Sequence, residues 1–255
     1  VKKFTVACSP DYAPMEFVDA SKSGQAQYIG FDMFLAKFVA EELGMELEIK
    51  PMSFDACQTA VSLGSVDAGI SGFSWEAERA ENYNLSSLYF AGENETEQIL
   101  VTTKENEGKF TTAESLNGKK VAAQIASLQE SMCNAQLTES EIVTVGDLTT
   151  ALMQLKNGDF DCLAVAKGQA EVFLANDPQI ALSGFSFAVA EENQGYVVLM
   201  KKGNDDLTKK INAALSKAEA QGLYATWYEQ AQVLAGSKDA SEVKYDDEGK
   251  PITTP

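Results

Sequence analysis

The sequence contains no histidine and only one arginine, Arg79, in 255 residues. Histidine is the commonest general base and the commonest metal ligand, so its absence argues against most acid–base enzymes and metal sites. We therefore expect neither a metal nor another cofactor. Every other basic side chain is a lysine, which makes the lone guanidinium the first candidate for a specific role.

Positive charge is scarce overall, since 20 Lys and Arg face 38 Asp and Glu and give a net charge of −18. This acidity argues against nucleic acid or an anionic membrane as a partner, because both would be repelled. No stretch approaches the roughly 18 apolar residues that a membrane span needs. The chain enters a strand pattern at once, without the apolar segment of a secretory signal, so any export signal would precede Val1.

Cysteines are few and show neither CxxC nor metal-ligand spacing. Each lies in an apolar stretch, which favours buried free thiols. One disulfide in each half of the fold is the alternative if the compartment is oxidising. The four are Cys8, Cys57, Cys133 and Cys162.

One pattern is present twice, at residues 54–70 and 148–165. In each copy a helix-like stretch ends at a glycine, an aspartate follows three residues later, and a short apolar run comes next. The pairs are Gly64 with Asp67, and Gly158 with Asp161. A helix closed by glycine and followed by a buried strand is one α/β unit. Two such units suggest two similar lobes, and small ligands bind in the cleft between lobes.

Strand and helix patterns alternate through the first part of the chain, which predicts a mostly parallel sheet with helices on both faces. A short helix is expected at 111–118. The polar stretch at 91–98 reads as a first crossing between lobes, and the strand YVVLM at 196–200 as the return. The expected domains are lobe 1 at 1–95, lobe 2 at 96–194, a return to lobe 1 with C-terminal helices at 195–236, and a loosely attached polar tail at 237–255.

The order and spacing of several short segments resemble the extracellular solute-binding proteins of family 3, the polar amino-acid class. The segments are YAPMEF at 12–17, IGFDM at 29–33, GSVDAGISG at 64–72, ESLNGKKVA at 114–122 and the run at 191–204. The similarity extends from Phe4 to about Leu234. It implies an α/β fold of two Rossmann-like lobes joined by two crossing strands, the type 2 periplasmic-binding fold.

The resemblance also implies a function. Members of this family capture one small solute by closing two lobes around it, and they deliver it to an ABC permease in the membrane. The expected ligand is a small carboxylate-bearing solute, above all an amino acid or a derivative. The expected protein is a monomer that is not an enzyme, periplasmic or extracellular, with a lipid anchor on the cell surface as a further option.

Arg79 matches the arginine that grips the ligand carboxylate in the family, a task suited to the bidentate guanidinium. The alternative is a surface ion pair with Glu76 or Glu78. Gly72 and Ser74 lie at the carboxyl end of the strand in the first repeat, where open α/β sheets bind ligands. The resemblance gives both a hydrogen-bonding role.

Tyr12 and Phe54 match side chains that flank the ligand, and aromatic rings bury such groups well. Phe54 could equally be core packing beneath its helix. Ser9 and Glu16 are further candidates at the edge of the pocket. The resemblance implies these roles, and the sequence alone leaves the choice for Phe54 open.

In the second lobe, Ser127, Leu128 and Gln129 match a segment that helps to hold the carboxylate at a helix start. Ala126 stands where the family has glycine. Gln194, just before the return strand, is an extra contact.

The main departure is Ala166, which stands where the family has an aspartate that binds the α-ammonium group of the ligand. A buried ammonium needs an acceptor. Another acid could substitute, namely Glu16, Glu191 or Glu192; the ligand could lack a free α-ammonium; or backbone carbonyls and water could satisfy it. These three options stay open.

Two other functions share the fold. A dehydratase acting on a cyclic acid would need an acid–base residue, for which Lys167 and Glu16 are the candidates. A sensor module of a receptor would be followed by a membrane segment or a signalling domain, whereas this chain ends in a polar tail.

Overall fold

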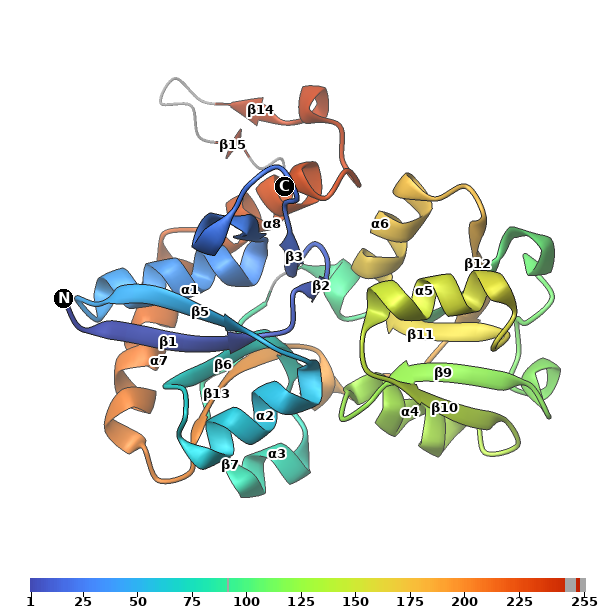
Figure 1. Cartoon of the computed structure of the whole chain (residues 1–255), viewed down its shortest axis with the longest axis horizontal. Helices are drawn as coiled ribbons and strands as arrows, with labels where there is room; N and C mark the ends of the chain where they lie inside the picture. Colours follow the sequence, from blue (N-terminus) through green and yellow to red (C-terminus); the bar gives the residue numbers. More distant parts are fainter. Residues whose placement is uncertain (91, 246–250, 253–255) are drawn as a thin grey trace. The chain divides into compact units, whose positions relative to one another are not determined.

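The computed structural model describes residues 1–90, 92–245 and 251–252. The chain divides into two compact units, each with its own sheet and core (Figure 1). Unit 1 is formed by Val1–Gly92 and Gly195–Pro255, and unit 2 by Glu93–Gln194.

The sheet of unit 1 has the strand order β5-β1-β6-β13-β7. The first three strands are parallel, and β13 runs antiparallel to both β6 and β7. Their bounds are β1 Lys3–Cys8, β5 Glu46–Pro51, β6 Ala68–Ser74, β7 Tyr83–Leu85 and β13 Tyr196–Lys201. A small second sheet follows β1 in the chain, with β2 Asp11–Tyr12, β3 Glu16–Val18 and β4 Tyr28–Ile29.

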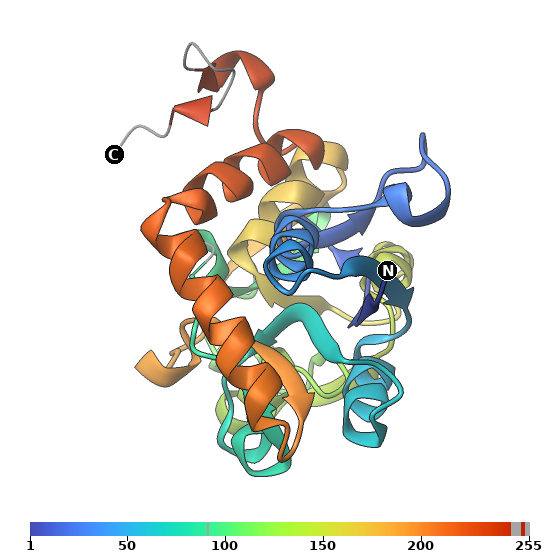
Figure 2. The same cartoon turned by 90° about the vertical axis from the view of Figure 1, so that its left-hand side faces the viewer.

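Helices cover both faces of this sheet. One face carries α1, which also packs against α7 and α8 (Figure 2). The other carries α2, which packs on β1, β6 and β13. The helices are α1 Phe31–Glu42, α2 Phe54–Leu63, α3 Ala77–Asn82, α7 Asp205–Ala220 and α8 Leu223–Leu234. Phe31 ties the first face together, because its ring contacts those of Tyr89, Tyr224, Trp227 and Tyr228.

Unit 2 repeats the same plan with the strand order β10-β9-β11-β8-β12. Again three strands are parallel, and the fourth, β8, is antiparallel to its neighbours. The strands are β8 Gln98–Thr103, β9 Lys120–Gln124, β10 Glu141–Val145, β11 Cys162–Ala166 and β12 Ile180–Ser186. The helices are α4 Leu128–Gln136, α5 Leu148–Asn157 and α6 Lys167–Asn176.

The repeated glycine and aspartate have the same local role in each unit. Gly64 and Gly158 end α2 and α5 in the left-handed conformation, with φ of 73° and 84°. Asp67 accepts the backbone N–H of Thr5 at 2.8 Å. Asp161 accepts that of Lys120 at 2.9 Å. Each aspartate thus ties the start of the central strand that follows it, β6 or β11, to the neighbouring strand, β1 or β9, which confirms the prediction of two α/β units.

Three details depart from the sequence-based expectations or refine them. The helix expected at 111–118 is a single 3-10 turn, Glu114–Leu116. All four cysteines are buried and free, so the alternative with disulfides is wrong. In the tail, described residues form a 3-10 turn at Ala240–Glu242 and pair β14 Lys244–Tyr245 with β15 Pro251–Ile252. The rest of the predicted loose tail, 246–250 and 253–255, lies outside the described residues.

Among the residues that the structure describes, no helix is both long and apolar enough to cross a membrane.

Candidate functional site

Arg79 is held at the carboxyl end of β6 by a hydrogen bond, an ion pair and two aromatic rings. It belongs to the short helix α3, and only 5% of it is exposed. Its Nη1 donates to the backbone oxygen of Ser74 at 2.7 Å and pairs with Glu76 at 2.8 Å. The guanidinium carbon lies 5.8 Å and 5.4 Å from the ring centres of Phe54 and Phe73. Burial lowers the pKa of Arg79 and the Glu76 carboxylate opposes that shift, but an arginine stays charged.

The ion pair with Glu76 is the alternative that the sequence left open for Arg79. The pair exists, yet it lies at a buried position rather than on the open surface. A buried, aromatic-backed guanidinium is a stronger electrostatic group than a solvated one, because little water screens it. The ion pair and a ligand-binding role are therefore compatible.

Tyr12 and Gly72 are brought together by a sharp backbone turn. Gly72 has a φ of +58°, and a Cβ placed there would lie 3.2 Å from the ring of Tyr12. The Tyr12 hydroxyl is 3.2 Å from that of Tyr196 on β13. The ring therefore lies directly against the end of β6, where a larger residue than glycine would displace it.

Phe54 packs in the core of unit 1 and also lies next to Arg79. It begins α2, belongs to a core cluster of unit 1 and stacks on Phe73 with ring centres 4.8 Å apart. The same ring also lies beneath the guanidinium of Arg79. Core packing thus fixes a side chain that borders the candidate site.

Ser9 and Glu16 lie deeper than a pocket edge would. Both are buried, and Glu16 has no exposed surface at all. The Ser9 backbone N–H donates to the hydroxyl of Ser71 at 2.9 Å, and that hydroxyl donates to Glu16 Oε1 at 3.0 Å. Sequence analysis missed Ser71 and the neighbouring Asp32. Asp32 could have been noticed, because it is a carboxylate on the otherwise apolar face of the helix predicted at 30–44.

In unit 2, the segment before α4 is held by its own hydrogen bonds. Ser127 caps the helix, accepting from the Glu130 N–H at 3.2 Å and donating to the Gln124 carbonyl at 2.6 Å. Leu128 is buried in the core of the unit. A helix start of this kind presents backbone N–H groups, which favours an anion nearby.

Gln98 links three of the predicted site residues of unit 2. Its Oε1 accepts from Gln129 at 2.7 Å, and its strand position is directly opposite Ala166. It also lines a hollow of about 320 Å³ together with the exposed Gln194. Sequence analysis missed Gln98 because it assigned this residue to the polar crossing at 91–98, whereas it is the first residue of β8.

Ala166 ends β11, is fully buried and forms the N-cap of α6 without a side-chain hydrogen bond. The next residue, Lys167, pairs with Glu97 at 3.2 Å. A methyl group therefore stands where a carboxylate would be needed to bind an ammonium group.

Ala126 has a φ of +61°, the one positive value for a non-glycine residue in the described chain. Ala126→Gly should relieve this strain and raise the free energy of unfolding by about 0.5–1 kcal/mol. The matched control is Ala113→Gly, at an exposed residue with a φ of −58°. That change should lower stability, because glycine only adds freedom to the unfolded chain. Urea unfolding measures both, and equal changes would contradict the strain argument.

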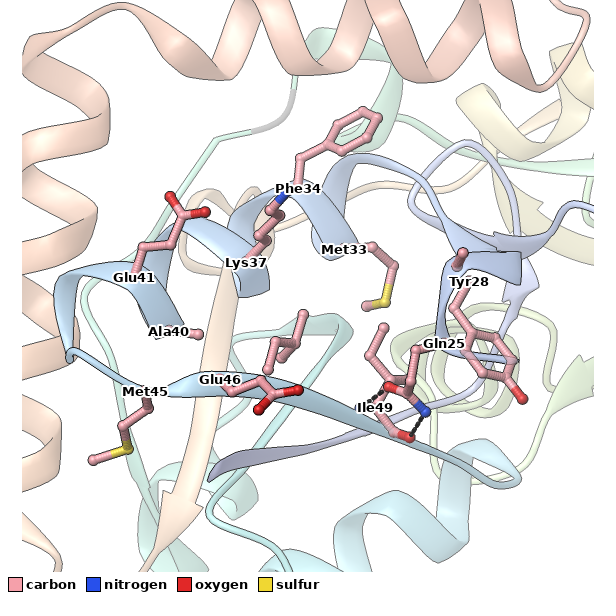
Figure 3. A pocket seen from close by; sticks show the side chains of 12 residues that line it. Gln25, Tyr28, Met33, Phe34, Lys37, Ala40, Glu41, Met45, Glu46 and Ile49 are labelled. Carbon is pink, nitrogen blue, oxygen red and sulfur yellow. Dashed lines mark hydrogen bonds between the residues drawn. The ribbon is translucent and has the colours of Figure 1, made fainter. Parts of the chain in front are cut away.

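A second hollow, of about 500 Å³, lies between α1 and β5 (Figure 3). Gln25 closes one end by exchanging two hydrogen bonds with the backbone of Ile49, at 2.6 Å and 3.1 Å. None of the predicted site residues lines it. Within the described part of the chain, no group of three or more Cys, Asp or Glu is arranged to hold a metal.

Several known proteins resemble this chain in sequence and fold. The family model for bacterial extracellular solute-binding proteins, family 3, matches residues 4–231. The arginine-binding extracellular protein ArtP of Bacillus subtilis is 28% identical, over 87% of this chain and 82% of its own. A probable histidine-binding protein of Campylobacter jejuni is 27% identical, over 87% and 81%.

A solved structure is also similar. The amino-acid ABC transporter substrate-binding protein AbpA of Streptococcus pneumoniae, crystallised with L-arginine, superposes with a TM-score of 0.82. It is 32% identical to this chain, and the match covers 92% of this chain and 97% of that one.

Proposed function

Because the chain belongs to the bacterial extracellular solute-binding proteins of family 3, we propose that it captures an amino acid for an ABC importer. The observation that carries the ligand class is the buried guanidinium of Arg79 at the carboxyl end of β6. Members of this family bind solutes and are not enzymes, so the dehydratase alternative lacks support.

The ligand carboxylate binds at Arg79 and next to Ser74. The guanidinium is held from behind by the Ser74 carbonyl and by the rings of Phe54 and Phe73. Holding the group in place before the ligand arrives reduces the entropy lost on binding. Glu76 occupies part of the guanidinium, so the ligand carboxylate competes with Glu76 or shares Arg79 with it.

The α-ammonium group of the ligand has no charged partner at the usual place, because Ala166 offers only a methyl group. Of the acids that could replace the missing aspartate, Glu16 is fully buried and bound to Ser71, whereas Glu191 and Glu192 are exposed. A missing acid removes an attraction worth about 1.5–3 kcal/mol. The amino acid and its α-keto analogue should therefore bind within about tenfold of each other.

A thermal-shift screen tests this function. It should cover the twenty L-amino acids, beginning with L-arginine, L-histidine and L-cystine, together with N-acetyl and α-keto analogues. A ligand at 100 times its Kd should stabilise the protein by about 2.7 kcal/mol. The control is the same set of compounds as methyl esters, which lack the carboxylate. If no carboxylate-bearing compound shifts the Tm, or if the esters shift it equally, the proposal is wrong.

ArtP, which is described as an extracellular protein, supports a location outside the cytoplasm, and we propose a periplasm or a cell surface. We propose that the two units act as lobes that close on the ligand and that the closed form docks on a membrane permease. An export signal that is removed, and a lipid anchor in the case of a cell surface, belong to the same proposal. Ultracentrifugation should give a monomer.

A further inference from the structure

Two buried carboxyl groups lie beneath the end of β6. Glu16 comes from β3 and Asp32 from the first turn of α1, and neither has any exposed surface. Burying even one carboxylate is unfavourable unless donors surround it. The partners of each oxygen atom therefore decide which of the two groups carries a charge.

Asp32 has the donors that an ionised carboxylate requires. Its Oδ2 accepts the backbone N–H of Gly72 at 2.6 Å. Its Oδ1 accepts the hydroxyl of Tyr89 at 2.7 Å. Both bonds are short, as is typical when the acceptor is charged.

Glu16 lacks such donors. Its Oε1 accepts the Ser71 hydroxyl, but its Oε2 is buried without a hydrogen-bond partner. The neighbouring titratable group is Asp32, whose oxygens can only accept when ionised. A proton on Glu16 resolves both problems, because Oε2–H then donates to Asp32.

We propose that Glu16 and Asp32 share a single proton and that this carboxyl pair positions Gly72, at the end of β6, for ligand binding. The pair acts through the bond from the Gly72 N–H to Asp32, and Gly72 in turn abuts the ring of Tyr12. Glu16 and Asp32 are positioning residues that do not touch the ligand. This inference rests on the proposed function only where it assigns Gly72 a role in ligand binding.

The electrostatic surroundings of Glu16 agree with this arrangement. Burial and then the charge of Asp32 raise the pKa of Glu16, and Asp11 of β2 adds to the effect. Cys8 of β1 and Tyr89 also face it. The negative charges oppose ionisation of Glu16, the hydrogen bond from Ser71 favours it, and the protonated Cys8 and Tyr89 supply no positive charge that would offset burial.

The raised pKa of Glu16 makes the free energy of unfolding depend on pH. The folded protein keeps the proton of Glu16 at pH values where the unfolded chain, with a pKa of about 4.3, has lost it. The contribution of this group to stability is therefore full below about pH 4 and declines as the pH rises toward the folded pKa. Glu16→Gln keeps both a donor and an acceptor but removes the titration.

The first test uses the protein without ligand. Infrared spectroscopy at neutral pH should show the carbonyl band of a protonated, buried carboxylic acid in the wild type and not in Glu16→Gln. Hydrogen exchange at the Gly72 amide should be slow in the wild type and in Glu16→Gln, and at least about tenfold faster in Asp32→Ala, whose side chain offers no acceptor to that N–H. Glu41→Gln, at an exposed position on the same helix, is the control.

The second test measures the Kd for L-arginine, and for each amino acid that the screen identifies, by calorimetry up to about pH 9. Glu16→Gln should stay within about threefold of the wild type at neutral pH and should lose the weakening that the wild type shows as the pH rises. Asp32→Ala and Glu16→Ala should each bind about tenfold more weakly or worse, which corresponds to about 1.4 kcal/mol.

The two tests separate the possible failures. If no amino acid binds the wild type, the proposed function is wrong, while the infrared and exchange results still decide whether the pair holds a proton. If amino acids bind but the acid band is absent, or Asp32→Ala binds as tightly as the wild type and keeps Gly72 protected, the carboxyl pair does not position the site and the inference is overturned.

Discussion

Replacing Arg79 with alanine is expected to weaken the binding of a carboxylate-bearing amino acid by at least about 100-fold. A bidentate, charge-assisted contact in a buried site is worth roughly 3 kcal/mol, and 1.4 kcal/mol is a factor of ten. Because it is the only arginine in the sequence, no other guanidinium can substitute. Isothermal titration calorimetry measures the loss, and circular dichroism establishes that the variant remains folded.

Two further variants separate charge from geometry. Arg79→Lys keeps the charge but loses the planar fork, so it should recover only part of the affinity. Glu76→Gln removes the carboxylate that pairs with Arg79 at 2.8 Å. It should bind the amino acid as tightly as the wild type or more tightly, because one competitor is gone. If Arg79→Ala bound the amino acid with unchanged affinity, the ligand carboxylate would have to bind somewhere other than Arg79.

Gly30→Ala is expected to lower the free energy of unfolding by about 3 kcal/mol or more. Gly30 precedes α1 with a φ of +124°, a conformation that other residues rarely adopt. A Cβ there would lie 2.8 Å from the carbonyl oxygen of Pro14 and closer still to that of Met15. Those two carbonyls accept the N–H groups of Phe31 and Asp32. The first turn of α1 therefore cannot move away from residues 14 and 15 to make room for the Cβ without losing both hydrogen bonds.

The matched control is Gly24→Ala. Gly24 also has a positive φ, +61°, but a Cβ at this position would meet no atom within 4 Å. The cost there should be about 1–2 kcal/mol, from the left-handed conformation alone. Urea unfolding of both variants measures the difference. If both variants lost the same free energy of unfolding, the positive φ alone, and not the close approach of the Pro14 and Met15 carbonyls, would explain the need for glycine at residue 30.

Local patterns in the sequence predicted the parts of the fold that depend on neighbouring residues. A glycine followed by an aspartate three residues later located the ends of α2 and α5 and the strands after them. The pattern worked because a left-handed glycine ends a helix by its local backbone geometry, whereas the hydrogen bond of each aspartate reaches a distant strand and could not be predicted from it. The helix expected at 111–118 was wrong because a few polar residues before a glycine form a single turn equally well.

The candidate site could be predicted only in part, because sequence patterns report mainly on residues that are close together in the chain. Arg79 stood out by its chemistry, since one guanidinium among lysines needs no structure to be noticed. Pairings between distant segments could not be found this way. Glu16 and Asp32 come from different elements, and their proximity depends on how β3 and α1 meet. Gln98 became visible only when β8 was placed opposite Ala166.

The order in which strands leave the ribosome differs between the two units. All five strands of the unit 2 sheet lie within Gln98–Ser186, so that sheet can form while the C-terminal part is still being made. In unit 1, β13 separates β6 from β7 in the sheet and is encoded after the whole of unit 2. Until Tyr196–Lys201 emerges, the nascent chain therefore carries an open edge on β6, next to Gly72 and Ser74. Unpaired strand edges promote aggregation, so this edge of β6 is the part of the unit 1 sheet most exposed to wrong pairing until β13 is added.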